Sequence, residues 1–180
     1  MQTRKNSWPA RLLLPLVLLS TLGLARANTE LESAQKLWLA GQRPQAVALV
    51  EQALSKTPDE LKLRFALGVM RMELGEQIAA LSIFTALTQD FPDLADPYNN
   101  LAVIHAGQGL LDQARSELEQ ALRLQPEHAQ AQENLGDVLL RLAVRAYQRA
   151  QAVQVSPSEP LALKIKRSQD LLLQITPRAR

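Results

Sequence analysis

Apolar residues recur three and four positions apart in several segments of the chain, which is the spacing of a helix with one apolar face. Near the end of the chain this face consists of Leu161, Ile165, Leu172 and Ile175. The opposite face carries Lys164, Arg167 and Gln174. We therefore predict a last amphipathic helix that starts near Pro160.

A longer helix is expected just before it. No Gly or Pro occurs between Asp137 and Val155, so residues near 130–154 are predicted to form one continuous helix, which the Ser156-Pro157-Ser158 segment ends. Only 4% of the residues are aromatic, which is few for a sheet core. The fold class predicted from these patterns is all-α.

Three residue types recur with a period of 34 residues. The columns are Gly41, Gly75 and Gly109, then Ala46, Ala80 and Ala114, then Pro58, Pro92 and Pro126. Glycine adopts the left-handed conformation past a helix C-cap without strain, and proline prevents a helix from continuing. The period therefore predicts pairs of helices, with a glycine turn inside each pair and a proline after it. A small residue such as Ala102 on one helix allows close packing against Ala114 on the next.

This pattern resembles the tetratricopeptide repeat family. The positions that carry the resemblance are Gly41, Ala46, Pro58, Gly68, Gly75, Ala80, Phe84, Pro92, Tyr98, Leu101, Ala102, Gly109, Ala114, Ala121, Pro126, Leu135 and Gly136. The repeats fall at about 27–60, 61–94, 95–128 and, in degenerate form, 129–158. The resemblance implies a right-handed solenoid of helix hairpins over residues 28–158, with a fused helix in the fourth repeat and a basic capping helix and tail over residues 159–180.

The first 27 residues have the layout of a cleavable signal peptide. Arg4, Lys5 and Arg11 precede an uncharged apolar run over residues 12–24, and the small residues of Ala25-Arg26-Ala27 follow it. We expect cleavage after Ala27 and export to the periplasm. The alternative is an uncleaved anchor, but 13 residues rise only about 20 Å as a helix, less than the ~30 Å hydrocarbon core.

Charge divides the remaining chain into an acidic body and a basic end. Residues 28–137 hold 8 bases and 16 acids, a net charge of −8, whereas residues 138–180 hold 8 bases and 2 acids, a net charge of +6. An acidic body repels a phosphate backbone, so nucleic acid is not expected as a partner. The basic end is a candidate for contact with the acidic body, within the chain or in another molecule, or with an anionic membrane surface.

The sequence offers few groups for catalysis or for metal binding. It has no Cys and two His, which excludes disulfides, thiolate metal sites and a cysteine nucleophile. His105 stands where the family usually has a packing aromatic, so we interpret it as a helix-packing residue, and His128 falls at a turn between repeats. Neither histidine has an obvious partner in the sequence. We predict no enzyme activity, no metal and no cofactor.

The resemblance also implies a binding site. In the family, the first helix of each pair lines a concave groove that holds peptides; the matching residues here are Leu31, Gln35, Trp38, Phe65, Val69, Met72, Asn99, Asn100, Val103 and Asn134. The alternative for the apolar residues is burial, and for the asparagines a role at a helix start. Lys62 and Arg141 are the only bases at groove positions, so a clamp for a terminal carboxylate is not expected.

Two functions are compatible with these features. The first is an exported scaffold or adaptor that binds a peptide or a partner helix in its groove, in cell-envelope protein assembly. The second is a structural subunit that self-associates, or joins an envelope complex, through its acidic body and basic end.

Overall fold

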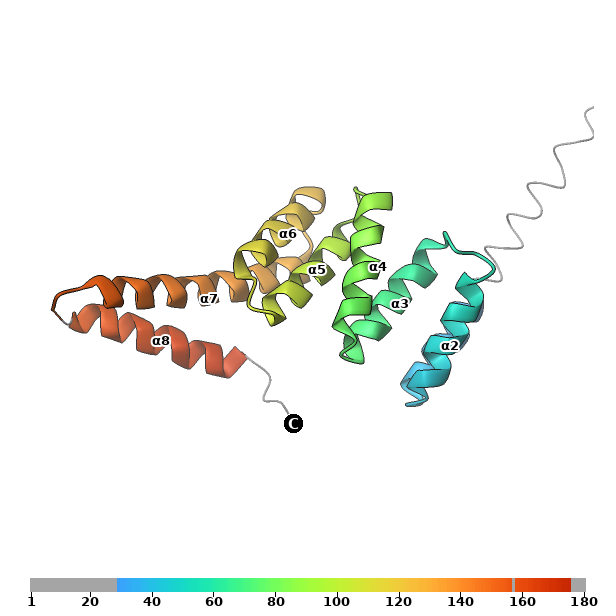
Figure 1. The fold of residues 1–180 in the computed structure, drawn as a ribbon, viewed down its shortest axis with the longest axis horizontal. Helices are drawn as coiled ribbons and strands as arrows, with labels where there is room; N and C mark the ends of the chain where they lie inside the picture. Colours follow the sequence, from blue (N-terminus) through green and yellow to red (C-terminus); the bar gives the residue numbers. More distant parts are fainter. Residues whose placement is uncertain (1–28, 157, 176–180) are drawn as a thin grey trace, which may run out of the picture. The chain divides into compact units, whose positions relative to one another are not determined.

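A computed structural model describes residues 29–156 and 158–175 of the chain (Figure 1). The described residues form helices and no strand, as predicted. Residues 29–39 are helical, and the further helices are α2 (Arg43–Leu54), α3 (Leu61–Glu73), α4 (Gln77–Asp90), α5 (Ala95–Gly107), α6 (Leu111–Leu124), α7 (Ala129–Val153) and α8 (Glu159–Ile175). The predicted signal peptide, Pro157 and the basic tail lie outside the described residues.

The chain divides into two compact units, one up to Met70 and one from Arg71 onward. No described helix combines the length and the apolar character required to cross a bilayer.

The three turn glycines have the conformation that the sequence predicts. Their φ angles are +77° at Gly41, +77° at Gly75 and +78° at Gly109. At Gly109 the backbone N–H donates to Ala106 O at 3.1 Å, and the N–H of Leu110 donates to His105 O at 2.9 Å. This pair of hydrogen bonds closes the last turn of α5 and is the Schellman arrangement. Gly41 and Gly75 end their helices with the same two hydrogen bonds. The period of 34 residues therefore marks one recurring turn.

The core of the first unit joins the helix of residues 29–39 to α2 and α3. Its buried residues are Ala34, Ala46, Val47, Val50, Ala53, Leu63 and Met70. Ala46 is fully buried, as the small residue of the repeat requires. α2 ends at Leu54, a few residues before Pro58.

The second unit is built around α5, which contacts α4, α6 and α7. Its main core cluster consists of Ala95, Ala102, Ala114, Leu118, Ala121, Ala131 and Val138. Ala102 and Ala114 are both fully buried in this cluster, which confirms small side chains between α5 and α6.

The fused helix of the fourth repeat is also confirmed, since α7 runs without interruption over 25 residues. α8 packs along α7 through Ile165, which is 8% exposed, while Leu161 and Leu172 are half-buried. Because α7 has no turn, the fourth repeat lacks the separate second helix that would pack on Gly136 in a complete repeat. A Cβ placed on Gly136 would meet no atom within 4 Å.

The start of α5 differs from what the Asp96-Pro97 pair suggests. An aspartate before a proline is typical of an N-cap followed by the first helical position. Here the N-cap is Leu94, and Asp96 lies inside the first turn. Pro97 is tolerated there because the first N–H groups of a helix have no intrahelical partner. The Asp96 carboxylate therefore does not cap α5, and it lies near His128 at the start of the next repeat.

Candidate functional site

Two of the groove residues expected in the first unit are packed against its core. Leu31 and Trp38 are half-buried and contact the buried cluster, and Gln35 is exposed. The guanidinium of Arg43 lies 5.2 Å from the centroid of the Trp38 ring, which is a cation–π distance. Trp38 therefore serves packing in its own unit and keeps only part of its surface for a ligand.

Phe65 and Val69 are half-buried on α3. Met72, near the start of the second unit, is half-buried as well. None of the apolar groove candidates in this part of the chain is fully exposed, so both burial and binding remain compatible with their positions.

In the second unit, the asparagines divide into two roles. The side-chain N–H of Asn134 on α7 donates to Oδ1 of Asn99 on α5 at 2.8 Å, although 35 residues separate them in sequence. Asn99 is 3% exposed and Asn100 is 9% exposed. The amide of Asn100 donates to the backbone carbonyl of Asp96 at 2.9 Å, inside its own helix. The structure thus brings Asn99 and Asn134 together, and it turns Asn100 toward the backbone of α5.

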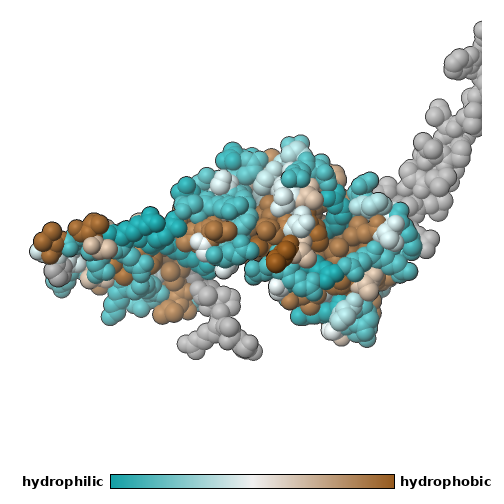
Figure 2. All heavy atoms as spheres, viewed as in Figure 1, coloured by the Kyte–Doolittle hydropathy of each residue, from teal (hydrophilic) through white to brown (hydrophobic). Residues whose placement is uncertain are grey.

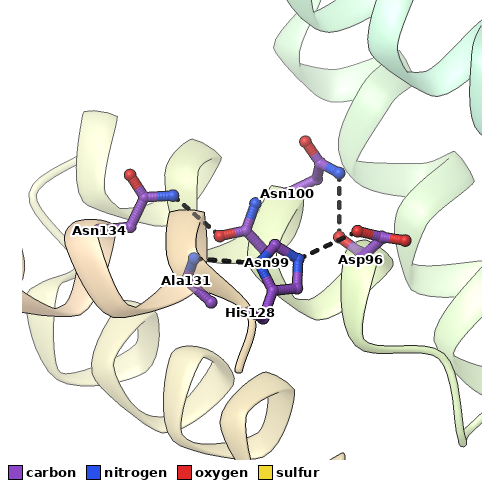
Figure 3. A network of polar contacts seen from close by, with 6 residues as sticks. All are labelled: Asp96, Asn99, Asn100, His128, Ala131 and Asn134. Atoms are coloured by element: carbon purple, nitrogen blue, oxygen red, sulfur yellow. Dashed lines mark hydrogen bonds and ion pairs between the residues drawn. The ribbon is translucent and has the colours of Figure 1, made fainter. Parts of the chain in front are cut away.

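A polar network continues from these asparagines to the start of α7 (Figure 3). His128 is the N-cap of α7, and its Nδ1 accepts a hydrogen bond from the backbone N–H of Ala131 at 3.3 Å. Its Nε2 lies 3.0 Å from Oδ1 of Asp96. Because Nδ1 accepts, the proton of the neutral ring must be on Nε2, where it points at the carboxylate. His128 therefore joins α7 to α5 and fixes the start of α7.

His105 also has a partner that the sequence did not reveal. Its Nδ1 lies 2.8 Å from Oε2 of Glu117 on α6, and the ring is 6% exposed. Burial raises the pKa of the Glu117 carboxyl above its ordinary value, and the hydrogen bond with His105 opposes that rise. The pair lies between two packed helices, so it holds them together and is covered from any substrate. This agrees with the interpretation of His105 as a packing residue.

A small cavity lies between α5, α6 and α7, beside the Asn99–Asn134 hydrogen bond. Its volume is about 180 Å³, and its lining residues are Ala102, Val103, Ala106, Gly107, Leu118, Asn134, Asp137, Val138 and Arg141. The apolar lining comes mainly from α5, and the polar groups come from α7. Val103 is 38% exposed, so part of its surface is available to a ligand. We call this the α5–α7 pocket.

Arg141 crosses the end of this pocket. Its Nη1 donates to the backbone carbonyl of Ala106 at 3.3 Å, near the C-terminus of α5. A cation is stabilised there because the carbonyls at the C-terminus of a helix carry a partial negative charge. Asp137, one turn earlier on α7, adds a carboxylate to the same lining. Sequence reasoning named Val103, Asn134 and Arg141 at groove positions and missed Asp137.

The pocket combines an apolar floor with amide, carboxylate and guanidinium groups at its edge. Such a surface can bury one apolar side chain and hydrogen-bond a neighbouring backbone. It offers no arrangement of a nucleophile and a base. Within the described ranges, no group of three His, Asp or Glu side chains is placed to hold a metal ion.

Comparisons with known proteins agree on the repeat. The family model described as Tetratricopeptide repeat matches residues 31–95 and 99–155. No curated protein matches the sequence. Among solved structures, the chain is similar to the first TPR domain of Spaghetti (RPAP3), bound to the HSP90 peptide SRMEEVD. The identity is 18% and the TM-score 0.60, and the alignment covers 65% of this chain and 93% of that one.

Two further solved structures are similar as well. MamA of Desulfovibrio magneticus RS-1 has 17% identity and a TM-score of 0.58, with 83% of this chain and 77% of that chain covered. YrrB, described as a TPR protein with an unusual peptide-binding site, has 25% identity and a TM-score of 0.55, with 59% and 55% covered. At the identities of RPAP3 and MamA, the likeness concerns the fold.

Proposed function

The chain belongs to the tetratricopeptide repeat family, and from this premise we propose that it is a non-catalytic scaffold that binds a peptide or a partner helix through the α5–α7 pocket. One observation carries the proposal: a partly exposed apolar floor at Val103 lies beside polar groups of α7 that can reach a ligand backbone. The RPAP3 domain, which has the same fold, is bound to a peptide of HSP90, which supports peptide binding as a function of this fold.

The ligand is expected to bind by an internal segment. A terminal carboxylate needs two or more cationic groups directed at it. Arg141 already donates to the carbonyl of Ala106, and the carboxylate of Asp137 lines the same pocket and repels a second anion. An apolar side chain on the floor, with backbone hydrogen bonds to Asn134 and Asp137, avoids this repulsion.

Site-specific photo-crosslinking from position 103 in intact cells tests the proposal. A photoreactive residue in place of Val103 should capture a defined partner, whereas the same residue in place of Ile78, which is 86% exposed on α4, should not. Val103→Glu should weaken capture, because a charge on an apolar contact surface is costly, and should leave helicity unchanged because the site is partly exposed. Equal capture from positions 103 and 78 would rule the pocket out as the site.

Export and domain limits form a separate part of the proposal. The basic start, the apolar run of residues 12–24 and the Ala25-Arg26-Ala27 segment support a leader that is removed after Ala27, a solenoid over residues 28–158 and a basic end over residues 159–180. The protein would then act in the periplasm, in envelope assembly. Mass spectrometry of the protein from its own cells checks this: we expect Asn28 at the N-terminus, and a species that retains Met1 contradicts it.

A further inference from the structure

The far end of the α7–α8 hairpin projects beyond the rest of the second unit. Arg145 on α7 pairs with Asp112 in the first turn of α6, so the start of α6 lies beside Arg145. α7 continues for eight more residues, to Val153, which corresponds to about 12 Å of helix. In the described chain, α8 is the helix that runs beside this part of α7 (Figure 1). We call residues 146–156 and 158–167 the hairpin end.

The hairpin end exposes large apolar side chains. Val153 is 81% exposed and Val155 is 101% exposed, and Leu163 on α8 is 46% exposed. Figure 2 shows a brown patch at this end of the hairpin, at the left of the view. An exposed apolar cluster at the tip of a projecting element is typical of an interaction site.

The same region is basic. Residues 146–167 contain four bases, Arg149, Lys164, Lys166 and Arg167, and one acid, Glu159. Lys166 and Arg167 are exposed, and in the described part of the chain neither has a carboxylate within ion-pair distance. Arg149 is exposed as well, and its charge helps to lower the pKa of the Asp112 carboxyl. Lys164 lies 5.8 Å from the centroid of the Tyr147 ring, which links α8 to α7 near the tip. The hairpin therefore presents cations beside its exposed valines.

We propose that the hairpin end docks on an anionic lipid surface, with Val153 and Val155 in the interfacial region and the cations at the lipid phosphates. Apolar insertion combined with basic side chains is how interfacial elements bind anionic bilayers. Residues 71–137, in the same unit as the hairpin end, hold 3 bases and 11 acids, a net charge of −8. An anionic surface repels this charge, so the field of the second unit turns its basic end toward the surface.

A lipid surface fits the hairpin end better than a second copy of this chain. The exposed valines sit at a convex tip, and a protein partner would need a matching apolar hollow to cover them. A fluid bilayer needs none, because its headgroups move apart around an inserted side chain. This contact is independent of the α5–α7 pocket, so either proposal can fail alone.

The absence of cysteine makes a direct test possible. Val155→Cys in the full chain carries a single polarity-sensitive fluorophore, and Ile78→Cys, at an exposed apolar position on α4, is the matched control. With phosphatidylglycerol vesicles at low salt, the probe at position 155 should shift to the blue, and the shift should shrink as salt rises. The probe at position 78 should not shift, and neither probe should shift with phosphatidylcholine vesicles. No shift at position 155, or equal shifts at both positions, overturns the proposal.

Charge removal gives the second measurement. Each cation near an anionic surface contributes about fivefold to partitioning, so the pair Lys166→Gln and Arg167→Gln should weaken the vesicle affinity about 30-fold. Arg115→Gln, at an exposed base of α6 that pairs with Glu119, is the control and should change it little. Light scattering of the labelled chain without vesicles tests self-association. If the molecular mass rises and the probe at position 155 shifts without vesicles, the hairpin end binds a second copy and the lipid assignment is wrong.

Discussion

Replacing single glycines tests the fused fourth repeat, because two glycines of the second unit should respond in opposite directions. Gly136 lies in the interior of α7, where glycine costs roughly 1 kcal/mol relative to alanine. A methyl group added there meets no atom within 4 Å, so it introduces no clash. We expect Gly136→Ala to raise the free energy of unfolding by about 0.5–1 kcal/mol, or roughly 2–3 °C in Tm for a chain of this size.

Gly109→Ala should have the reverse effect. A methyl group at position 109 also meets no atom within 4 Å, but its φ of +78° is strained for an L-residue by about 1–2 kcal/mol. The loss of chain entropy in the unfolded state offsets about 0.4–1 kcal/mol of this. The net expectation is destabilisation by about 1 kcal/mol. Gly107→Ala, two residues earlier and without a positive φ, is the matched control and should not destabilise.

Urea unfolding followed by circular dichroism at 222 nm measures all three variants. A Gly136→Ala variant whose free energy of unfolding falls by more than about 0.5 kcal/mol would contradict this reasoning. Such a loss would require a neighbour close enough to clash with the added methyl group. Such a neighbour would be the second helix that the fourth repeat lacks here, and the continuous helix would then be wrong.

Substitutions at three positions test the polar contacts of the second unit. Glu117→Ala leaves the buried His105 ring without its partner and should lower the free energy of unfolding by about 1–3 kcal/mol, whereas Glu117→Gln keeps an acceptor. Burial raises the pKa of Glu117 in the folded state, so the wild type loses stability as the pH rises from the ordinary carboxyl pKa to the folded one. Over that pH window, the stability of Glu117→Gln in urea titrations should therefore rise relative to that of the wild type. His128→Ala should lose about 1 kcal/mol with the cap of α7, and His128→Asn should recover most of it, as thermal unfolding can check. Arg145→Ala should return the lowered pKa of the exposed Asp112 carboxyl toward its ordinary value in an NMR titration, because the hydrogen bond from Arg145 is the main cause of the shift.

The sequence predicted the local features of the fold because each depends on one residue type. A left-handed turn needs glycine, so Gly41, Gly75 and Gly109 marked the ends of three helices. The absence of Gly and Pro from residue 138 to residue 154 likewise predicted the long α7. The start of α5 was predicted less well, since the Asp96-Pro97 pair fits both an N-cap and a first turn.

The partners of polar side chains could not be predicted from single positions. Asn134 contacts Asn99 across 35 residues, His128 contacts Asp96 across 32, and Arg145 contacts Asp112 across 33. All these separations are close to the repeat period, because equivalent helices of successive repeats lie side by side. A search for complementary side chains one period apart would have found the partner of His128. It would not have found the pair of His105 and Glu117, which lie within one repeat.

The loss of one turn in the fourth repeat explains why two surfaces of different chemistry occur on a single helix. Up to Arg141, α7 occupies the place of a first helix, so its polar residues face α5 and line the pocket. Beyond Arg145, α6 no longer accompanies it, and α8 packs along it instead. The change of net charge near residue 138 coincides with this exchange of neighbours. If the pocket binds a peptide and the hairpin end binds lipid, Val103→Glu and the Lys166→Gln, Arg167→Gln pair should each weaken one interaction and leave the other intact, because the two sites share no residue.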